Sequence, residues 1–198
     1  MTKLIRILIV FCLLCNSLLG STNDLKINDK LIVRGMRSVT SRKVSAVIVH
    51  STFNNSGGDK YDIDLIIKQF SRYGVSSHYV IGRDGIIYRL VKENNVAFHA
   101  GKSVLPNGHK NLNACSIGIE LINAFDDSPT DFQIKSLTTL VTEISKRHKI
   151  EFLLRHSDIA PERKTDPWNM NWDGFLAQVR PLGIPIAKQN QKTHSSDL

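Results

Sequence analysis

Three short segments of the chain are almost continuously apolar and rich in β-branched residues. They span residues 44–50 (VSAVIVH), 116–122 (SIGIELI) and 152–154 (FLL). Such runs are typical of strands that are buried on both faces of a sheet. We therefore predict three buried strands. Each predicted strand has an ionisable residue in it or close to its end: His50 ends the first, Glu120 lies within the second, and His156 follows the third after Arg155.

Other segments show the spacing of helices or the composition of a hairpin. Apolar residues recur at helical spacing in 63–70 and from Ile134 to Ile144, and 172–179 predict a last helix. Ser128 followed by Pro129 predicts that the central helix has its N-cap at Ser128 and fades near His148. The turn residues 82–85 (GRDG) separate two apolar triplets, which predicts a hairpin over 75–90.

Strands alternating with helices predict an α/β fold, a single domain in which helices cover a central mixed β-sheet. We place this domain at residues 44–180. Residues 21–43 are mixed and polar and are expected to form an N-terminal arm, and residues 181–198 have few apolar side chains and are expected to form a flexible tail. The order of the strands does not follow from this pattern.

The first twenty residues have the order of a secretory signal peptide. Lys3 and Arg6 precede an apolar run at 7–15, and small residues follow. The run is shorter than the roughly 18 to 20 residues that span a bilayer, so cleavage is favoured over an anchor. A lipoprotein anchor is less favoured, because bulky Phe11 and Leu14 precede the two cysteines of this segment. We predict export to the periplasm or cell envelope.

The charge balance of the chain is basic, with 26 Lys plus Arg against 18 Asp plus Glu, a formal charge of +8. Removing residues 1–20 would remove two basic residues and leave 24 against 18, or +6. Such a balance suits an acidic partner: nucleic acid, an anionic membrane or an anionic wall polymer. No nucleic-acid-binding motif is found. Cys115 would be the one cysteine left after this removal, so we expect no internal disulfide. Stability would then come from the apolar core or from a bound metal.

His50 and His156 are candidates for a functional site, because each lies at the C-terminal end of an apolar strand. Side chains at such strand ends reach the edge of the sheet, where α/β folds usually bind ligands. A polar loop stiffened by two prolines follows His156 and offers several carboxylates, including Asp158 and Asp166. Two imidazoles and one carboxylate form a known zinc set with a fourth position left for water. Glu120 is the obvious acid to move a proton.

Five further groups of residues, taken together, carry a family resemblance. They are 47–52 (VIVHST), 77–85 (SHYVIGRDG), 98–101 (FHAG), 116–121 (SIGIEL) and 156–167 (HSDIAPERKTDP). In this order they resemble the zinc N-acetylmuramoyl-L-alanine amidases of the AmpD-like, or amidase type 2, family, to which the peptidoglycan recognition proteins are similar. The resemblance covers about residues 44–179 and implies that family's fold.

The resemblance also implies roles for residues at matching positions. It implies one zinc ion on His50, His156 and Asp166, with Glu120 and Lys164 as catalytic residues. His99, Asn123 and Arg163 are candidates for substrate contact, although structural hydrogen bonding is an alternative for His99 and solvent exposure for Arg163. Asp158 either supports an imidazole or caps the local turn.

The implied function is zinc-dependent hydrolysis of the amide bond between N-acetylmuramic acid and L-alanine in peptidoglycan or muropeptides. The alternative is a muropeptide-binding module without catalysis. We expect a monomer that binds no nucleic acid and has no stable membrane span. The preference between anhydro-muropeptides and intact peptidoglycan remains open.

Overall fold

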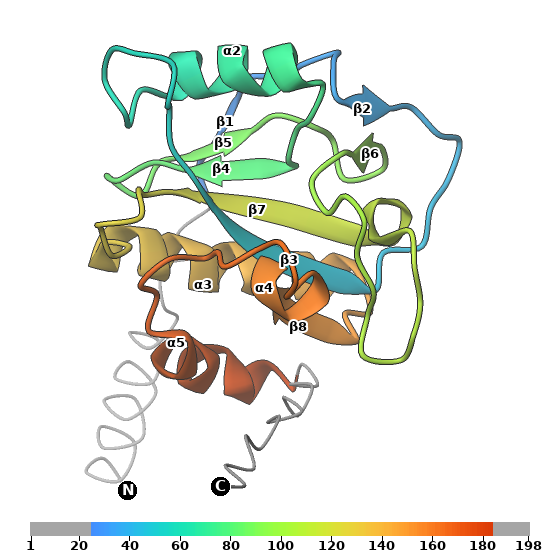
Figure 1. Cartoon of the computed structure of the whole chain (residues 1–198). Coiled ribbons are helices and arrows are strands. Elements are labelled where there is room, and N and C mark those ends of the chain that lie inside the picture. Colours follow the sequence, from blue (N-terminus) through green and yellow to red (C-terminus); the bar gives the residue numbers. More distant parts are fainter. Residues whose placement is uncertain (1–24, 184–198) are drawn as a thin grey trace, which may run out of the picture.

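The computed structural model describes residues 25–183 and has a central six-stranded sheet (Figure 1). The strands are β1 (Ile27–Asp29), β3 (Ala46–Thr52), β4 (Tyr79–Ile81), β5 (Ile87–Arg89), β7 (Ser116–Ile122) and β8 (Phe152–Arg155), in the order β1-β5-β4-β7-β3-β8. β5 pairs antiparallel with β4, and the other neighbours are parallel. The predicted mixed sheet is confirmed.

The two central strands, β3 and β7, are buried along their whole length. They pair in parallel, with Val47 opposite Ile117 and His50 opposite Glu120. Residues that pair across neighbouring strands point to the same face of a sheet, so His50 and Glu120 share a face. β8 lies on the other side of β3, which brings its end and His156 to the same edge.

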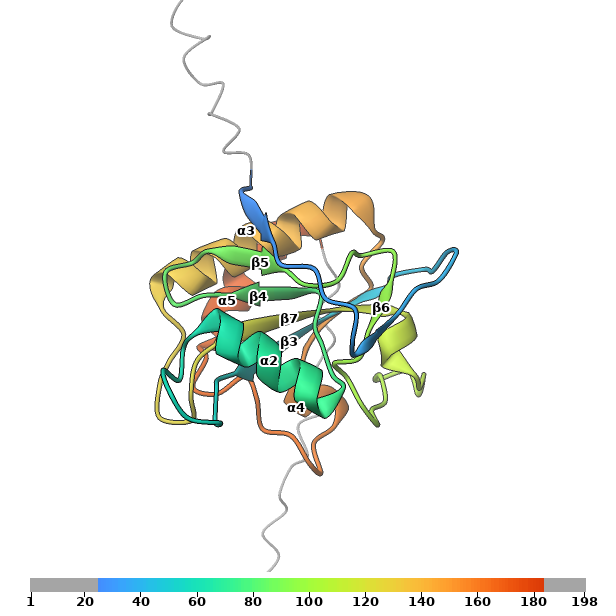
Figure 2. The ribbon, with the colours of Figure 1, turned by 90° about the horizontal axis from the view of Figure 1, so that it is seen from above.

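Helices cover both faces of this sheet (Figures 1 and 2). On one face, α3 (Asp131–Arg147) and α5 (Trp172–Val179) pack apolar side chains such as Leu140 and Phe175 against Val47, Ile117 and their neighbours. On the other face, α2 (Ile63–Tyr73) packs Ile66 and Phe70 against Val80. The short helix α4 (His156–Ile159) lies on this second face as well, with Ile159 in a cluster that includes Ile48.

The N-cap of α3 is Thr130, so the prediction of Ser128 is wrong by two residues. The Thr130 hydroxyl accepts a hydrogen bond from the backbone N–H of Gln133 at 3.2 Å. The Gln133 side chain in turn accepts one from the backbone N–H of Thr130 at 3.0 Å. This reciprocal capping box satisfies two donors at the helix start. The helix ends at Arg147 with His148 as its C-cap, as predicted.

The hairpin prediction is confirmed, since β4 and β5 pair across the turn at 82–85. The described part of the predicted arm adds strand β1 to the sheet, and β2 (Met36–Arg37) pairs with β6 (Val96–Ala97) in a separate two-stranded sheet. Two 3-10 helices complete the elements, η2 (Leu112–Ala114) and η3 (Arg180–Leu182).

The predicted signal peptide, residues 1–20, lies outside the described residues, as does the predicted tail beyond residue 183. Within residues 25–183, no helix has the length and apolar character that crossing a membrane requires. Because these terminal segments are not described, the predicted boundaries of the signal peptide and the tail remain a prediction.

Candidate metal centre and catalytic cleft

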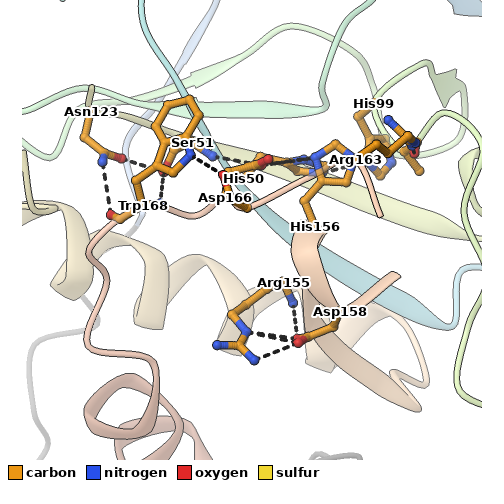
Figure 3. A network of polar contacts seen from close by, with 12 residues as sticks. His50, Ser51, His99, Asn123, Arg155, His156, Asp158, Arg163, Asp166 and Trp168 are labelled. Carbon is orange, nitrogen blue, oxygen red and sulfur yellow. Dashed lines mark hydrogen bonds and ion pairs between the residues drawn. The ribbon is translucent and has the colours of Figure 1, made fainter. Parts of the chain in front are cut away.

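Three buried side chains converge at the carboxyl ends of β3 and β8. His50 comes from β3, His156 is the first residue of α4, and Asp166 lies in the loop between α4 and α5. They are 1%, 4% and 4% exposed. Nδ1 of His156 lies 2.8 Å from Nδ1 of His50 and 3.1 Å from Oδ2 of Asp166, and the third side of this triangle is 3.5 Å. Figure 3 shows the three groups facing one another.

This geometry fits a tetrahedral metal ion. Ligands at 2.0 to 2.1 Å from such an ion lie about 3.3 Å from one another, and the three observed distances bracket that value. Burial, only partly offset by Asp166, lowers the pKa of His50 to about 4, which keeps the imidazole neutral and able to act as a ligand. Burial alone would raise the pKa of Asp166, but its close contacts with His156 and His50 hold it below its usual range. A neutral His50 imidazole and an ionised Asp166 carboxylate are the forms of these two groups that bind a metal ion.

Glu120 lies on β7 beside this centre, on the face that it shares with His50. It is 8% exposed. Burial and the nearby Asp166 carboxylate raise the pKa of Glu120 to about 8, while Lys164 lowers it. A carboxyl group with its pKa near neutrality can both take and return a proton. Lys164 and Glu120 line the same pocket.

A pocket of about 310 Å³ opens over this edge of the sheet. Its lining includes Glu120, His156, Lys164 and Arg163, together with Phe70 of α2. A larger cavity of about 530 Å³ lies on the other side of Arg163 and is lined by none of the three converging residues. The cleft that serves the candidate centre is therefore the smaller, more polar one.

Of the residues predicted to contact substrate, Arg163 and His99 line the pocket. The Arg163 guanidinium donates to the backbone carbonyls of Ala100 and Lys102, each at 2.7 Å, and so ties two loops of the cleft together. His99 is 9% exposed, and both of its ring nitrogens contact protein groups, His50 and Ser116. Substrate contact by these two residues stays a prediction.

Asn123 is fully buried, so the structure does not present its side chain to a substrate. Its Oδ1 accepts from the Ser51 hydroxyl at 2.6 Å, and its amide donates to the carbonyl of Trp168 at 3.2 Å. The Ser51 hydroxyl also accepts from the backbone N–H of Trp168 at 3.1 Å. Asn123 and Ser51 thus hold the loop that carries Asp166 through hydrogen bonds to the backbone of Trp168. The sequence analysis did not predict this role. The one sequence feature that points to it is the position of Ser51 directly after His50.

Asp158 makes no contact with an imidazole among the described residues. Its carboxylate accepts from the backbone N–H and guanidinium of Arg155, at 2.9 and 2.7 Å, and Figure 3 shows these bonds apart from the candidate metal centre. Of the two alternatives, the cap at the start of α4 is the one observed.

Comparison with known proteins gives consistent relatives. The model of the N-acetylmuramoyl-L-alanine amidase family matches residues 40–169. The 1,6-anhydro-N-acetylmuramyl-L-alanine amidase AmpD of Haemophilus influenzae is 38% identical over 110 residues, which are 54% of this chain and 59% of that protein. The chain thus matches little more than half the length of this relative.

Two solved structures share the fold. A selenomethionine derivative of AmpD superposes with a TM-score of 0.61 at 29% identity, covering 75% of this chain and 96% of that one. AmiD of Escherichia coli, in complex with the substrate anhydro-N-acetylmuramic acid-L-Ala-D-γ-Glu-L-Lys, superposes with a TM-score of 0.60 at 29% identity, covering 75% and 62%. The expected fold is confirmed.

Proposed function

This chain belongs to the N-acetylmuramoyl-L-alanine amidase family, and on that premise we propose that it hydrolyses the amide bond between N-acetylmuramic acid and L-alanine with the help of zinc. The observation that carries the proposal is the convergence of His50, His156 and Asp166, next to a pocket that both His156 and Glu120 line. The substrate of the AmiD complex contains this same bond.

The three converging residues would hold the zinc ion. Bound zinc supplies Lewis acidity, which polarises an amide carbonyl and lowers the pKa of water. Two imidazoles and one carboxylate are a set that would hold zinc and leave room for water or substrate.

Glu120 moves the proton. As a carboxylate it takes a proton from the water that attacks the carbonyl carbon, and the new C–O bond forms. Glu120 then gives this proton to the nitrogen of alanine as the C–N bond breaks, which yields a carboxylic acid and a free amine. The positively charged Lys164 ammonium stabilises the negative charge that develops on the carbonyl oxygen. This interaction is stronger in a cleft that holds little water than in bulk solvent.

The decisive experiment compares wild type with Glu120→Gln and His156→Ala on muropeptide and on intact peptidoglycan, with products identified by mass. Removing a general acid/base costs on the order of 10² to 10⁴ in rate, so Glu120→Gln should bind zinc normally and lose most turnover. His156→Ala should lose both zinc binding and turnover. Wild-type activity should disappear on chelation and return with zinc.

Two outcomes would contradict the proposal. Wild-type turnover by Glu120→Gln would remove Glu120 from the mechanism. A metal-free protein that binds muropeptide without cleaving it would favour the binding-module alternative. The pair of substrates also distinguishes a preference for anhydro-muropeptides from activity on the intact wall.

We further propose that the protein works outside the cytoplasm. The basic, apolar and small-residue order of residues 1–20 supports export, and the formal +6 of residues 21–198 suits an anionic wall polymer. Cell fractionation followed by N-terminal sequencing tests this. An intact N-terminus on a cytoplasmic protein would contradict it.

A further inference from the structure

His99 lies directly behind His50, on the side opposite the converging metal ligands. It follows β6, and its ring meets that of His50 edge to face, with ring centroids 5.1 Å apart. Its Nδ1 lies 3.0 Å from Nε2 of His50, and its Nε2 lies 3.2 Å from the Ser116 hydroxyl. Figure 3 shows His99 beyond His50, at the end of the polar network away from Asn123.

The far end of this chain of hydrogen bonds has a fixed direction. The Ser116 hydroxyl donates to the backbone carbonyl of Leu112 at 2.6 Å, and a carbonyl oxygen can only accept. The single hydroxyl proton is thereby used, so the Ser116 oxygen must accept from Nε2–H of His99. A neutral imidazole carries one proton, so Nδ1 of His99 is an acceptor.

The same direction continues to the metal centre. Because Nδ1 of His99 accepts, Nε2 of His50 must be the donor, and Nδ1 of His50 then carries the lone pair. Nδ1 is the atom that faces His156 and Asp166. A backbone carbonyl three hydrogen bonds away therefore selects the tautomer of His50 that can bind a metal.

The surrounding fold is shaped to hold the His99 ring. Gly118 lies beneath it on β7, and a Cβ atom there would come within 2.5 to 2.8 Å of three ring atoms. Asn113 accepts from the backbone N–H groups of His99 and Ala100, at 3.1 and 2.8 Å, and so fixes the loop. Any side chain larger than glycine at 118 would push the ring out of line with His50.

We infer that His99 is a positioning residue which, through Ser116 and the Leu112 carbonyl, holds His50 in the tautomer that presents Nδ1 to a metal ion. The inference rests on the zinc centre of the proposed function. Partners of this kind orient metal-binding histidines, and their loss costs about 10- to 100-fold in metal affinity.

The test measures the zinc dissociation constant by competition with a chelator, without substrate, for wild type, His99→Leu, His99→Asn and His109→Leu. His99→Leu should weaken zinc binding about 10- to 100-fold. His99→Asn keeps an acceptor oxygen near the position of Nδ1 and should recover most of the affinity. The matched control is His109→Leu, the same change at an exposed histidine, and it should leave affinity unchanged.

Three results would overturn the inference. His99→Leu with wild-type zinc affinity would remove the positioning role, and a raised KM for muropeptide in a separate activity assay would then make His99 a substrate contact. Equal loss of affinity in His99→Leu and His99→Asn, with equally lowered Tm of the metal-free proteins, would make it a packing residue. A wild-type protein that binds no zinc would overturn both this inference and the proposed function. Normal zinc binding with the expected variant pattern, but no amidase activity, would support the inference and contradict the proposed function alone.

Discussion

At the scale of single residues, the candidate metal centre depends on side chains outside the three converging groups. Asp166 sits in a loop, and the backbone N–H of Ser51 reaches its carboxylate only at 3.4 Å. Its position relies on the neighbouring bonds among Ser51, Asn123 and Trp168. Because these groups are polar and Asn123 is fully buried, each must keep its partner.

Replacing Asn123 by Ala should therefore destabilise the fold and loosen Asp166. The change leaves the Ser51 hydroxyl and the Trp168 carbonyl without their partner, which costs about 1 to 3 kcal/mol for a buried polar group. We expect this loss in the free energy of urea unfolding, together with weaker zinc binding. Thr165→Ala is the control, since it removes only an exposed hydrogen bond with the Trp168 indole in the same loop. Equal effects of the two changes would refute a special role for Asn123.

At the scale of the element, the strand ends could be predicted from sequence and the loop contacts could not. The apolar runs before His50 and His156 place both histidines at one sheet edge, because parallel strands end together. Asp166 was reached only through the family resemblance, since its loop holds other carboxylates of equal chemical merit. The partners of His99 and Asn123 lie on distant segments, and no local pattern encodes such tertiary contacts.

The start of α3 shows how local rules can mislead. Ser128 followed by Pro129 has the composition of a helix start, yet Thr130 with Gln133 also forms a complete capping box. The Thr130 hydroxyl additionally donates to the carbonyl of Arg83 at 2.8 Å, a tertiary bond that fixes the helix against the β4–β5 turn. The tertiary contact explains why the later residue is the cap.

Thr130→Ala should destabilise the protein by about 0.5 to 2 kcal/mol, the range over which loss of an N-cap side chain falls. Ser128→Ala is the matched control and should change the unfolding free energy by less than about 0.5 kcal/mol, as surface substitutions usually do. Urea unfolding followed by circular dichroism measures both. A larger loss for Ser128→Ala than for Thr130→Ala would restore the first prediction of the cap.

At the scale of the whole molecule, one carboxylate joins α3 to the sheet. Glu93 follows β5, and its side chain is 14% exposed. It accepts hydrogen bonds from the Tyr79 hydroxyl on β4 and from Arg147 at the end of α3, both at 2.7 Å, and contacts His148 at 2.7 Å. Burial alone would raise the pKa of Glu93, but these hydrogen bonds and the charge of Arg147 lower it to about 2.

This depressed pKa predicts how stability depends on acid. The unfolded carboxyl titrates near 4.5, so the folded state binds its proton less readily than the unfolded state does. The contribution of Glu93 is therefore fully present above about pH 4.5 and is lost as the pH falls toward 2. It should amount to roughly 2 to 3 kcal/mol. Glu93→Gln should lower stability at neutral pH and flatten the slope of unfolding free energy against pH in this window.

Glu143→Gln is the control, because Glu143 forms a surface pair with Lys146 and its loss should leave that slope unchanged. If Glu93→Gln kept the wild-type slope between pH 4.5 and 2, the acid sensitivity would have to arise elsewhere in the molecule.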